Sequence, residues 1–517
     1  MVHAIIDAQH VRSYATLSLG DGTCAVDRIL AACALLADTT SMLVRPGAVK
    51  VVPGEESPYL SVDTGRVRIP LGVGIVPVED GTPGGVLSKL SSLGEGADAL
   101  VYVRADEPCM IVDEAQRILD EHVQYRAHYS FADGYPAGAT PVVLSPSLPR
   151  LLVRLVEADD DTGSPDWLFT VLQRDINSFD VETLLSPVDF RMLRITFRCD
   201  TRANFVLCSR FLPLLASKER ATVVSRDQYV SSVADNYSKL RTLPMYMSVE
   251  VTAGVSQQVV YNPLVQNSPE NEPRFMPADR FSALVTQLDR LSPEAVVGIC
   301  TWGEPLKHPE LEALLEAVCA TDSLSLVVET GGIGRSGPEV VQLAERYGSR
   351  VTWIVALDAI DEAVYGRIRG EGFAEAMAFA EHLVAEIPDR SYVQAVRMKE
   401  TEEHLETFWR YWKQKTDHII IQKYDDVCGL LPARKVTDLS PVQRFPCWHN
   451  KRDLYVRLNG DVPRCREDIR TAYGIGNLFR EPMEDVWNRG DELHLKHVSG
   501  TYPELCEQCD EYYTFNF

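Results

Sequence analysis

The sequence predicts an α/β fold with mainly parallel sheets, divided into roughly three domains. Short apolar runs typical of strands alternate with helical patterns almost from end to end, and this order builds parallel sheets covered by helices. At 517 residues the chain is too long for a single hydrophobic core. Its 45% hydrophobic and 24% charged residues are close to the average of soluble globular proteins, so we expect it to be folded throughout.

The charge of the chain disfavours two classes of partner. The formal net charge is −23, so nucleic acid or an acidic membrane face would be repelled over most of the surface. The first residues show no basic region followed by an apolar stretch and a cleavage site, and no window is apolar enough to cross a bilayer. We therefore expect a cytoplasmic protein that binds neither nucleic acid nor membranes.

An N-terminal domain is predicted over residues 1–222. It opens with the strand Ala4–Ala8, continues with the helix Ala25–Ala37, and includes the later strand ADALVYV, which ends at Val103. A polar stretch follows and ends at a proline, which cannot continue a helix. We predict that this stretch, residues 223–244, is a linker.

A second α/β series is predicted over residues 245–440. Its predicted strands are YMSVEVT, AVVGICT, SLSLVVET, VTWIVAL, YVQAVRM and HIIIQKY. Its predicted helices are Arg280–Leu291, Pro309–Ala320, Pro338–Tyr347, Phe373–Ile387 and Glu402–Trp412. About six strand–helix units predict an open or partial barrel.

The tail, residues 441–517, has short segments, four cysteines and no large apolar core, and a small domain of that kind usually needs a metal to fold. Cys506 and Cys509 form a C-x-x-C pair that can bind one metal centre from a single turn. Cys447 precedes a strand-like run, and Cys465 is predicted on the return strand of the resulting hairpin. These residue types suit an iron–sulfur cluster or zinc, and their spacing leaves both open, together with a structural role without any metal.

The remaining cysteines are expected to have no part in this site. A chain without an export signal does not use twelve cysteines as a disulfide framework, because the cytosol keeps thiols reduced. We expect Cys428 to be a loop thiol with no assigned role. Seven others stand singly and are expected to fill the core, namely Cys24, Cys33, Cys109, Cys199, Cys208, Cys300 and Cys319.

Three stretches of the tail resemble the SPASM domain that follows the barrel in many radical S-adenosylmethionine enzymes. They read CWHNKRDLYVRLNGDVPRC, GIGNLFREPMEDVWN and LCEQC. The resemblance implies an auxiliary 4Fe–4S cluster on Cys447, Cys465, Cys506 and Cys509, and it favours iron over zinc. The larger cysteine set that holds two clusters is absent, which implies one cluster ligated entirely by protein thiolates.

The preceding segment resembles the barrel of the same enzymes at three places. Gly303-Glu304-Pro305-Leu306 is similar to the GGEPL-type motif, and VVETGG and ALDAIDEAVYGRIRG are similar to later strand ends. The resemblance implies a residual pocket for S-adenosylmethionine at Gly303 and Glu304, whereas the alternative is a plain turn after a buried strand.

The cysteine loop that starts radical chemistry in this family is missing. Its three ligand positions hold Val255, Val259 and Asn262, and none of these supplies a thiolate for iron. The barrel is therefore expected to be unable to form the adenosyl radical.

Residues 1–222 resemble the nucleotide-sugar cytidylyltransferases. The resemblance rests on the strands AIIDA and ADALVYVRADEP and on the run PVDFRMLRITF, and it implies that Asp106 binds a magnesium ion that bridges nucleotide phosphates. Two features depart from the pattern of that family. Of the residues that clamp the triphosphate in the opening loop, only Arg12 is present. Near the position of the second metal-binding Asp stands Arg198, and Asp200 is two residues away. Asp106 as a turn residue is the alternative.

Taken together, the three resemblances cover essentially the whole chain and match the spiro-SPASM family. They imply an iron–sulfur protein whose barrel has lost radical initiation and serves as a binding or redox component, with a redox partner, in a modification or glycan pathway. The competing hypothesis is a CMP-type nucleotide-sugar nucleotidyltransferase with accessory domains. The sequence identifies neither a substrate nor a catalytic residue.

Overall fold

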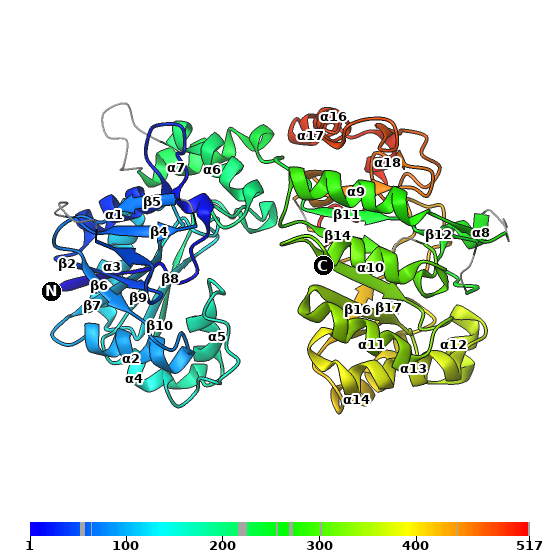
Figure 1. The fold of residues 1–517 in the computed structure, drawn as a ribbon, viewed down its shortest axis with the longest axis horizontal. Helices are drawn as coiled ribbons and strands as arrows, with labels where there is room; N and C mark the ends of the chain where they lie inside the picture. The colour runs from blue at the N-terminus through cyan, green and yellow to red at the C-terminus, as the bar shows by residue number, and fades with distance from the viewer. Residues whose placement is uncertain are drawn as a thin grey trace. The chain divides into compact units, whose positions relative to one another are not determined.

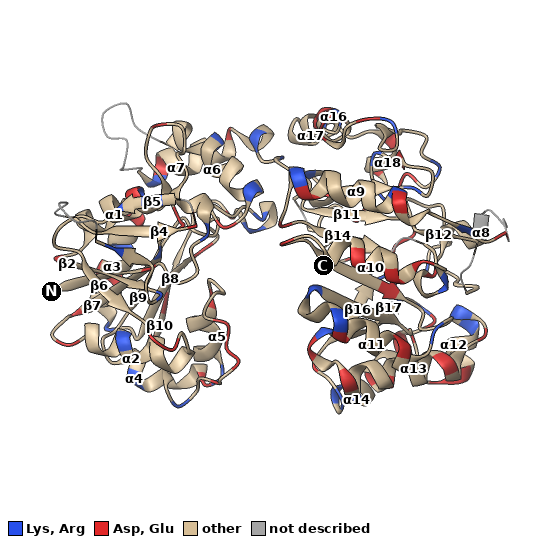
Figure 2. Ribbon diagram, viewed as in Figure 1, with Lys and Arg blue, Asp and Glu red and all other residues tan. Residues whose placement is uncertain are grey.

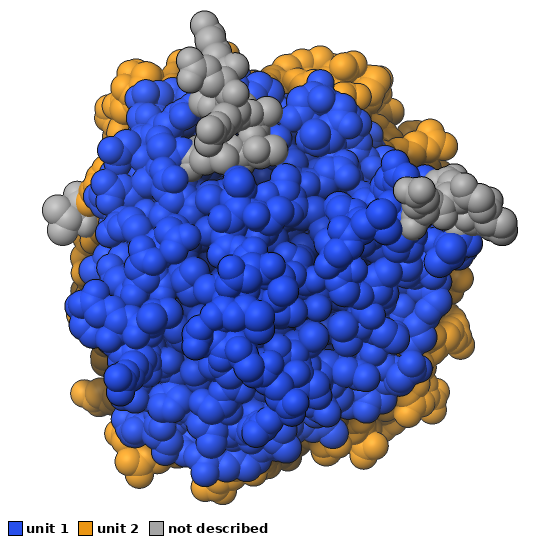
Figure 3. All heavy atoms as spheres, turned by 90° about the vertical axis from the view of Figure 1, so that its left-hand side faces the viewer, with its two compact units in different colours: residues 1–242 blue, residues 243–517 orange. Residues whose placement is uncertain are grey.

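The protein is described here by a computed structural model covering residues 1–51, 57–63, 65–215, 225–254, 257–267, 272–299, 302–441 and 443–514. The chain forms two compact units, residues 1–242 and 243–517 (Figures 1 and 3). The division between them falls inside the segment predicted as a linker. Figure 2 shows acidic and basic residues mixed along the helices of both units. No helix among the described residues is long and apolar enough to span a membrane.

Unit 1 is built on a seven-stranded sheet in the order β10-β8-β9-β7-β1-β2-β6. Only β9 runs against its neighbours, so the sheet is mainly parallel, as predicted. Its strands are β1 (Val2–Asp7), β2 (Thr39–Val44), β6 (Gly74–Pro77), β7 (Ala99–Arg104), β8 (Tyr129–Asp133), β9 (Val142–Leu144) and β10 (Val181–Leu185). Every residue of β7 is buried, which is typical of a central strand covered by helices on both faces.

The helices of unit 1 follow its strands along the chain. They are α1 (Ala25–Leu36), α2 (Pro83–Leu93), α3 (Val112–Tyr125), α4 (Leu148–Leu152), α5 (Trp167–Gln173), α6 (Arg202–Leu215) and α7 (Arg226–Ala234). A small antiparallel sheet contains β3 (Val49–Lys50), β4 (Tyr59–Val62) and β5 (Gly65–Arg68). Helix α7 lies within the segment predicted as a linker, and its buried Tyr229 packs edge-on against Phe197, which fixes this segment to unit 1.

Unit 2 confirms the predicted partial barrel. Its seven strands are all parallel and lie in the order β18-β17-β16-β15-β14-β11-β19. They are β11 (Tyr246–Val249), β14 (Val296–Ile299), β15 (Ser325–Thr330), β16 (Val351–Ala356), β17 (Ser391–Arg397), β18 (Ile419–Lys423) and β19 (Asp453–Val456). From β11 to β18 the spatial order follows the chain order, as right-handed strand–helix–strand connections require.

The helices α9, α10, α11 and α13 cover one face of this sheet (Figure 1). The helices of the barrel are α8 (Pro263–Asn267), α9 (Ala278–Leu291), α10 (Leu311–Cys319), α11 (Gly337–Tyr347), α12 (Glu362–Arg369), α13 (Phe373–Glu386) and α14 (Leu405–Lys413). The tail adds α15 (Trp448–Arg452), α16 (Met483–Arg489), α17 (Asp491–Val498) and α18 (Glu504–Glu507). Two short antiparallel pairs are β12 (Thr252–Ala253) with β13 (Arg274–Phe275), and β20 (Asp461–Val462) with β21 (Gly476–Asn477).

The tail differs from its prediction in one respect. Its first strand, β19, does not form a hairpin ladder but joins the barrel sheet beside β11, and Cys465 lies beyond the two-residue return strand β20. The buried Leu454 of β19 and Trp487 of α16 belong to the same apolar core as the barrel. A segment with so few apolar residues buries more of them against an existing core than it could alone.

Candidate functional site

Four cysteines from separate segments of the tail line one cavity. Cys447 immediately precedes α15, Cys465 follows β20, and Cys506 lies in α18. The amide of Cys509 donates to the carbonyl oxygen of Cys506 at 3.2 Å, and this turn brings the C-x-x-C pair to the same wall. The structure therefore gathers all four thiols that the sequence predicts as metal ligands.

Burial keeps three of these thiols protonated in the absence of a metal. It raises the pKa of Cys506 to about 11 and raises the pKa values of Cys447 and Cys465 further, and the charges of neighbouring thiolates add to the effect. Thiolates are the metal-binding form, so loading a metal here would release protons. Ionisation of these thiols therefore has to be offset by the charge of the group that binds there.

A fifth thiol, that of Cys428, lies beside the site. It hydrogen-bonds to Cys509, and this bond lowers the pKa of Cys509. Val427 and Cys428 have φ values of 54° and 53°, a left-handed conformation that is rare for a β-branched residue. The sequence analysis gave Cys428 no role, and the one available signal was its position in the turn Asp-Val-Cys-Gly, nineteen residues before Cys447.

The separation of the sulfur atoms bears on the identity of the metal. Among the described residues, no three of these thiol sulfurs lie within 4.8 Å of one another. In a tetrahedral zinc site with Zn–S bonds of about 2.3 Å, the sulfurs would stand roughly 3.8 Å apart. Thiolates around a four-iron cluster are farther apart because the irons lie between them. The structure gathers the four thiols around one cavity, as a four-iron cluster ligated by protein thiolates requires.

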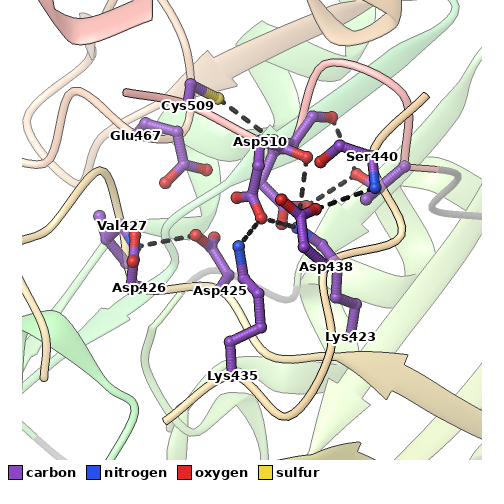
Figure 4. Close-up of polar contacts among 12 residues, drawn as sticks. Lys423, Asp425, Asp426, Val427, Lys435, Asp438, Ser440, Glu467, Cys509 and Asp510 are labelled. Atoms are coloured by element: carbon purple, nitrogen blue, oxygen red, sulfur yellow. Dashed lines mark hydrogen bonds and ion pairs between the residues drawn. The ribbon is translucent and has the colours of Figure 1, made fainter. Parts of the chain in front are cut away.

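An acidic group next to the thiols does not offer a second metal site. Oxygens of Asp425, Asp510 and Glu511 lie within 4.8 Å of one another. Lys435 and Lys423 both reach Asp510, the latter at 2.9 Å (Figure 4), and Lys423 also pairs with Glu511. Lysine ammonium groups therefore already pair with Asp510 and Glu511, and the guanidinium of Arg466 pairs with Asp425.

A second cavity lies at the carboxyl ends of the barrel strands and contains the two residues predicted to hold S-adenosylmethionine. Gly303 and Glu304 follow β14 and line this cavity. The Glu304 carboxylate accepts hydrogen bonds from the amides of Leu306 and Gly331, at 3.0 and 2.8 Å, and from the hydroxyl of Thr330 at 2.5 Å. Burial raises the pKa of Glu304. Its oxygens thus join the end of β14 to the end of β15.

Gly303 is required by packing. A Cβ at this position would stand 2.2 Å from the carbonyl oxygen of Thr252, so no larger residue fits without moving the backbone. The preceding Trp302 has a φ of 59°, an uncommon conformation for a bulky side chain. The close approach of the backbone at Gly303 to the backbone at Thr252 therefore explains the glycine of the Gly303-Glu304-Pro305-Leu306 motif.

The loop that holds the radical-initiating cluster in the family is held here by other means. Val255 lies outside the described residues, and Val259 and Asn262 are buried. The Asn262 side chain donates to the carbonyl oxygen of Trp302 at 2.8 Å and accepts from the amide of Leu264 at 3.0 Å, which caps α8. A former ligand position has thus become a helix cap.

Two further sets of contacts fix the same loop. The Tyr261 hydroxyl donates to Asp358 at 2.7 Å, and the Arg369 guanidinium donates to Asp358 at 3.1 Å and to the Tyr261 oxygen at 3.0 Å. An apolar cluster also packs the loop against the segment before the tail, and its members are Tyr261, Leu264, Trp302, Val427, Leu430, Leu431 and Ile469. No iron is needed to order this loop.

In unit 1, Asp106 is fully buried just beyond β7. A guanidinium nitrogen of Arg198 donates to one Asp106 oxygen at 3.1 Å, and Arg104 stands 3.6 Å from the other. Arg198, which stands near the position where the resemblance implies a second metal-binding Asp, also lies 3.5 Å from Asp200, two residues on. Arginine therefore supplies the positive charge where magnesium was predicted, and these residues do not fit a divalent ion. The predicted phosphate ligand Arg12 is exposed.

Comparison with known proteins places the tail in a described family. The sequence model of SPASM, an iron-sulfur cluster-binding domain, matches residues 447–510. An "uncharacterized protein" of Treponema pallidum (strain Nichols) is 35% identical over 364 residues, which are 68% of this chain and 99% of that protein. A second protein of the same organism is 36% identical over 72 residues, 14% of this chain and 33% of the relative.

Several solved structures are distantly similar. BtrN in complex with AdoMet and 2-DOIA has 16% identity and a TM-score of 0.35 over 52% of this chain and 94% of its own. Streptococcus suis SuiB bound to precursor peptide SuiA has 14% identity and a TM-score of 0.41 over 51% and 68%. A cytidylyltransferase from Leptospira borgpetersenii has 15% identity and a TM-score of 0.33 over 46% and 95%. Because these similarities are remote, they do not indicate which chemistry this chain performs.

Proposed function

The chain belongs to the spiro-SPASM family, and from this premise we propose that it is an iron–sulfur protein with one 4Fe–4S cluster and a barrel that binds without starting radical chemistry. The proposed ligands are Cys447, Cys465, Cys506 and Cys509. The observation that carries the proposal is that these four thiols line one cavity and lie within residues 447–510, the segment that matches the iron-sulfur cluster-binding domain.

A cluster bound to four protein thiolates supplies single-electron transfer and offers no open iron to a substrate. The residues around the site have the corresponding tasks. The Cys428 thiol and the amide of Glu511, at 3.3 Å, both donate hydrogen bonds to the Cys509 sulfur. Hydrogen bonds to ligand sulfur stabilise negative charge there and raise the reduction potential.

The barrel is proposed to bind a small molecule at the ends of its strands. Neither Val259 nor Asn262 can ligate iron, so the pocket at Gly303 and Glu304 can hold S-adenosylmethionine only as an intact ligand. The ammonium group of S-adenosylmethionine would bind the Glu304 carboxylate, which already accepts hydrogen bonds from three donors of the protein. In this role the protein would be a binding or redox component of a modification or glycan pathway and would exchange electrons with a redox partner.

The nucleotide-sugar nucleotidyltransferase is the weaker candidate. That reaction needs a divalent ion to neutralise charge on the transferred phosphoryl group. Arg198 occupies this position at Asp106, and burial with the Asp106 charge raises the pKa of the adjacent Glu107 to about 7. Incubation with each nucleoside triphosphate, magnesium and acidic sugars should release no pyrophosphate, and release would favour this candidate instead.

The decisive experiment is the metal content of anaerobically purified protein. We expect a brown protein with about four irons and four sulfides per chain and an electron paramagnetic resonance signal after reduction. Colourless protein with one zinc would refute the cluster. A reduced sample mixed with S-adenosylmethionine should give no 5′-deoxyadenosine, and calorimetry then decides whether the intact molecule binds.

A further inference from the structure

The interior of the barrel contains a connected space that extends beyond the pocket at Glu304. A deeper cavity of about 360 Å³ is lined by inward-facing residues of β11, β15, β16, β17 and β18. The two cavities share four lining residues, Glu329, Gln422, Lys423 and Arg466. Barrel interiors are normally filled by side chains, so a polar-edged space of this size calls for an occupant.

Glu329, on β15, is the one of these shared residues whose charge is not balanced by a direct ion pair. Its Oε1 accepts a hydrogen bond from the side-chain amide of Gln394 at 2.9 Å. Its other carboxylate oxygen has no hydrogen-bond or ion-pair partner among the described residues and borders the cavities. Burial raises the pKa of this carboxyl group, although the hydrogen bond from Gln394 and the charges of Arg466 and Arg369 act against the shift.

Each of the three cationic side chains that line the two cavities already forms an ion pair with a carboxylate. Lys423 pairs with Asp510 and Glu511, and Arg466 pairs with Asp425 at 2.5 Å. The third cation, Arg369, is bound to Asp358, as described above.

The walls of the two cavities therefore carry more acid than base. Their charged residues are Glu304, Glu329, Asp425 and Glu511 against Arg369, Lys423 and Arg466. A ligand that brings one positive charge would balance the set, whereas an anionic ligand would worsen it.

We propose that the barrel interior binds a small primary amine whose ammonium group donates to the unpaired oxygen of Glu329. The apolar part of the ligand lies against Ile354 and Ile420 in the deeper cavity. This proposal rests on the proposed function in one point, that the barrel serves for binding, and it names the chemical class of the ligand. It assigns the site to a strand position other than the Gly303-Glu304 motif.

Three aromatic probes that differ only in charge test the proposal: tyramine is cationic, 4-ethylphenol is neutral and 3-(4-hydroxyphenyl)propanoate is anionic. In calorimetry with the iron-loaded full chain, we expect tyramine to bind at least about tenfold more tightly than 4-ethylphenol, the usual effect of one charge-assisted hydrogen bond, and the propanoate to bind most weakly. Equal affinities for the three probes, or no binding of tyramine at 10 mM, would overturn the proposal, 10 mM being roughly the weakest binding calorimetry detects.

Glu329→Gln keeps the side-chain shape and removes the charge, so it should abolish the preference for tyramine. Exposed Glu403 offers the matched control Glu403→Gln, which should retain the preference. If Glu329→Gln does not fold, Glu329→Asp keeps the charge one methylene farther away and should weaken tyramine while preserving its rank. A preference that survives Glu329→Gln refutes the site.

Iron content separates this proposal from the proposed function. Four irons per chain with no preference among the probes would refute the amine site and leave the cluster standing. A clear preference for tyramine in a protein without iron would refute the cluster and leave the amine site standing.

Discussion

The thiol site of the tail and the mouth of the barrel show two ways of ordering irregular chain in the same unit. At the thiol site, four sulfurs approach one cavity, and burial raises the pKa values of three of them, Cys447, Cys465 and Cys506. At the barrel mouth, the corresponding loop has no thiol at its described ligand positions and is held by a helix cap, an ion pair and an apolar cluster. The thiol site is proposed to bind a metal, whereas the described part of the loop at the barrel mouth is held by protein contacts.

The barrel mouth keeps a pocket although Val259 and Asn262, which line it, supply no thiolate for iron. The barrel sheet, the close approach at Gly303 and the Glu304 hydrogen bonds are all present although iron cannot be bound beside them. Contacts that order a loop need only good packing and satisfied polar groups, whereas radical initiation needs an open iron. The pocket at Glu304 is therefore held by protein contacts that need no iron ligand.

The largest expected effect is at the thiol site. Cys465→Ser should lower the iron content from about four atoms per chain to less than one, because a hydroxyl is a far weaker iron ligand than a thiolate. Iron analysis and the visible absorption spectrum measure it. Cys319→Ser, on α10, is the control and should keep its iron. A variant at Cys465 that retained four irons would break the comparison.

The next effect is at the barrel mouth and should leave the iron unchanged. Residue 358 has a φ of 66°, which asparagine tolerates as well as aspartate does. The substitution Asp358→Asn therefore keeps the backbone but leaves the buried charge of Arg369 without a counter-ion. We expect the free energy of unfolding to fall by about 3 kcal/mol in urea titrations. The double variant Asp358→Asn with Arg369→Met should recover most of this loss, and a single variant as stable as the parent would contradict the role of the pair.

A smaller loss is expected from the residue that replaced a ligand. Asn262→Ala removes the cap of α8 and should reduce the free energy of unfolding by about 1 kcal/mol. Asn262→Asp retains the capping oxygen, so its loss should be smaller. Thermal unfolding followed by circular dichroism ranks the three proteins, and an alanine variant more stable than the aspartate variant would show that the cap does not order this loop.

The smallest effect sharpens the boundary of the thiol site. Lys435→Met removes an ammonium group from partly exposed Asp510, next to Cys509. Ion pairs of this exposure contribute less than about 1 kcal/mol, and salt screens them. We expect an unchanged iron content and a stability difference that shrinks in 1 M salt, where the Debye length is about 3 Å compared with about 10 Å at 0.1 M. Loss of iron would mean that the lysine belongs to the metal site.

Much of the molecule could be predicted from local sequence alone. Alternating apolar and helical patterns place β7, β15, β16 and the helices that follow them, because burial on both faces leaves a continuous apolar run that few other structures tolerate. The four metal-site cysteines could be predicted as well, because no other residue type supplies thiolates.

Only the tertiary structure decided where the remaining groups act. The strand β19 joins the barrel because parallel pairing satisfies the edge of β11, a choice that depends on residues 200 positions away. Arg198 meets Asp106, Cys428 meets Cys509 and Glu329 faces a cavity for the same reason. Local composition fixes which groups a chain possesses, but the charge that each one meets is set by neighbours distant in sequence, and that charge determines its chemistry.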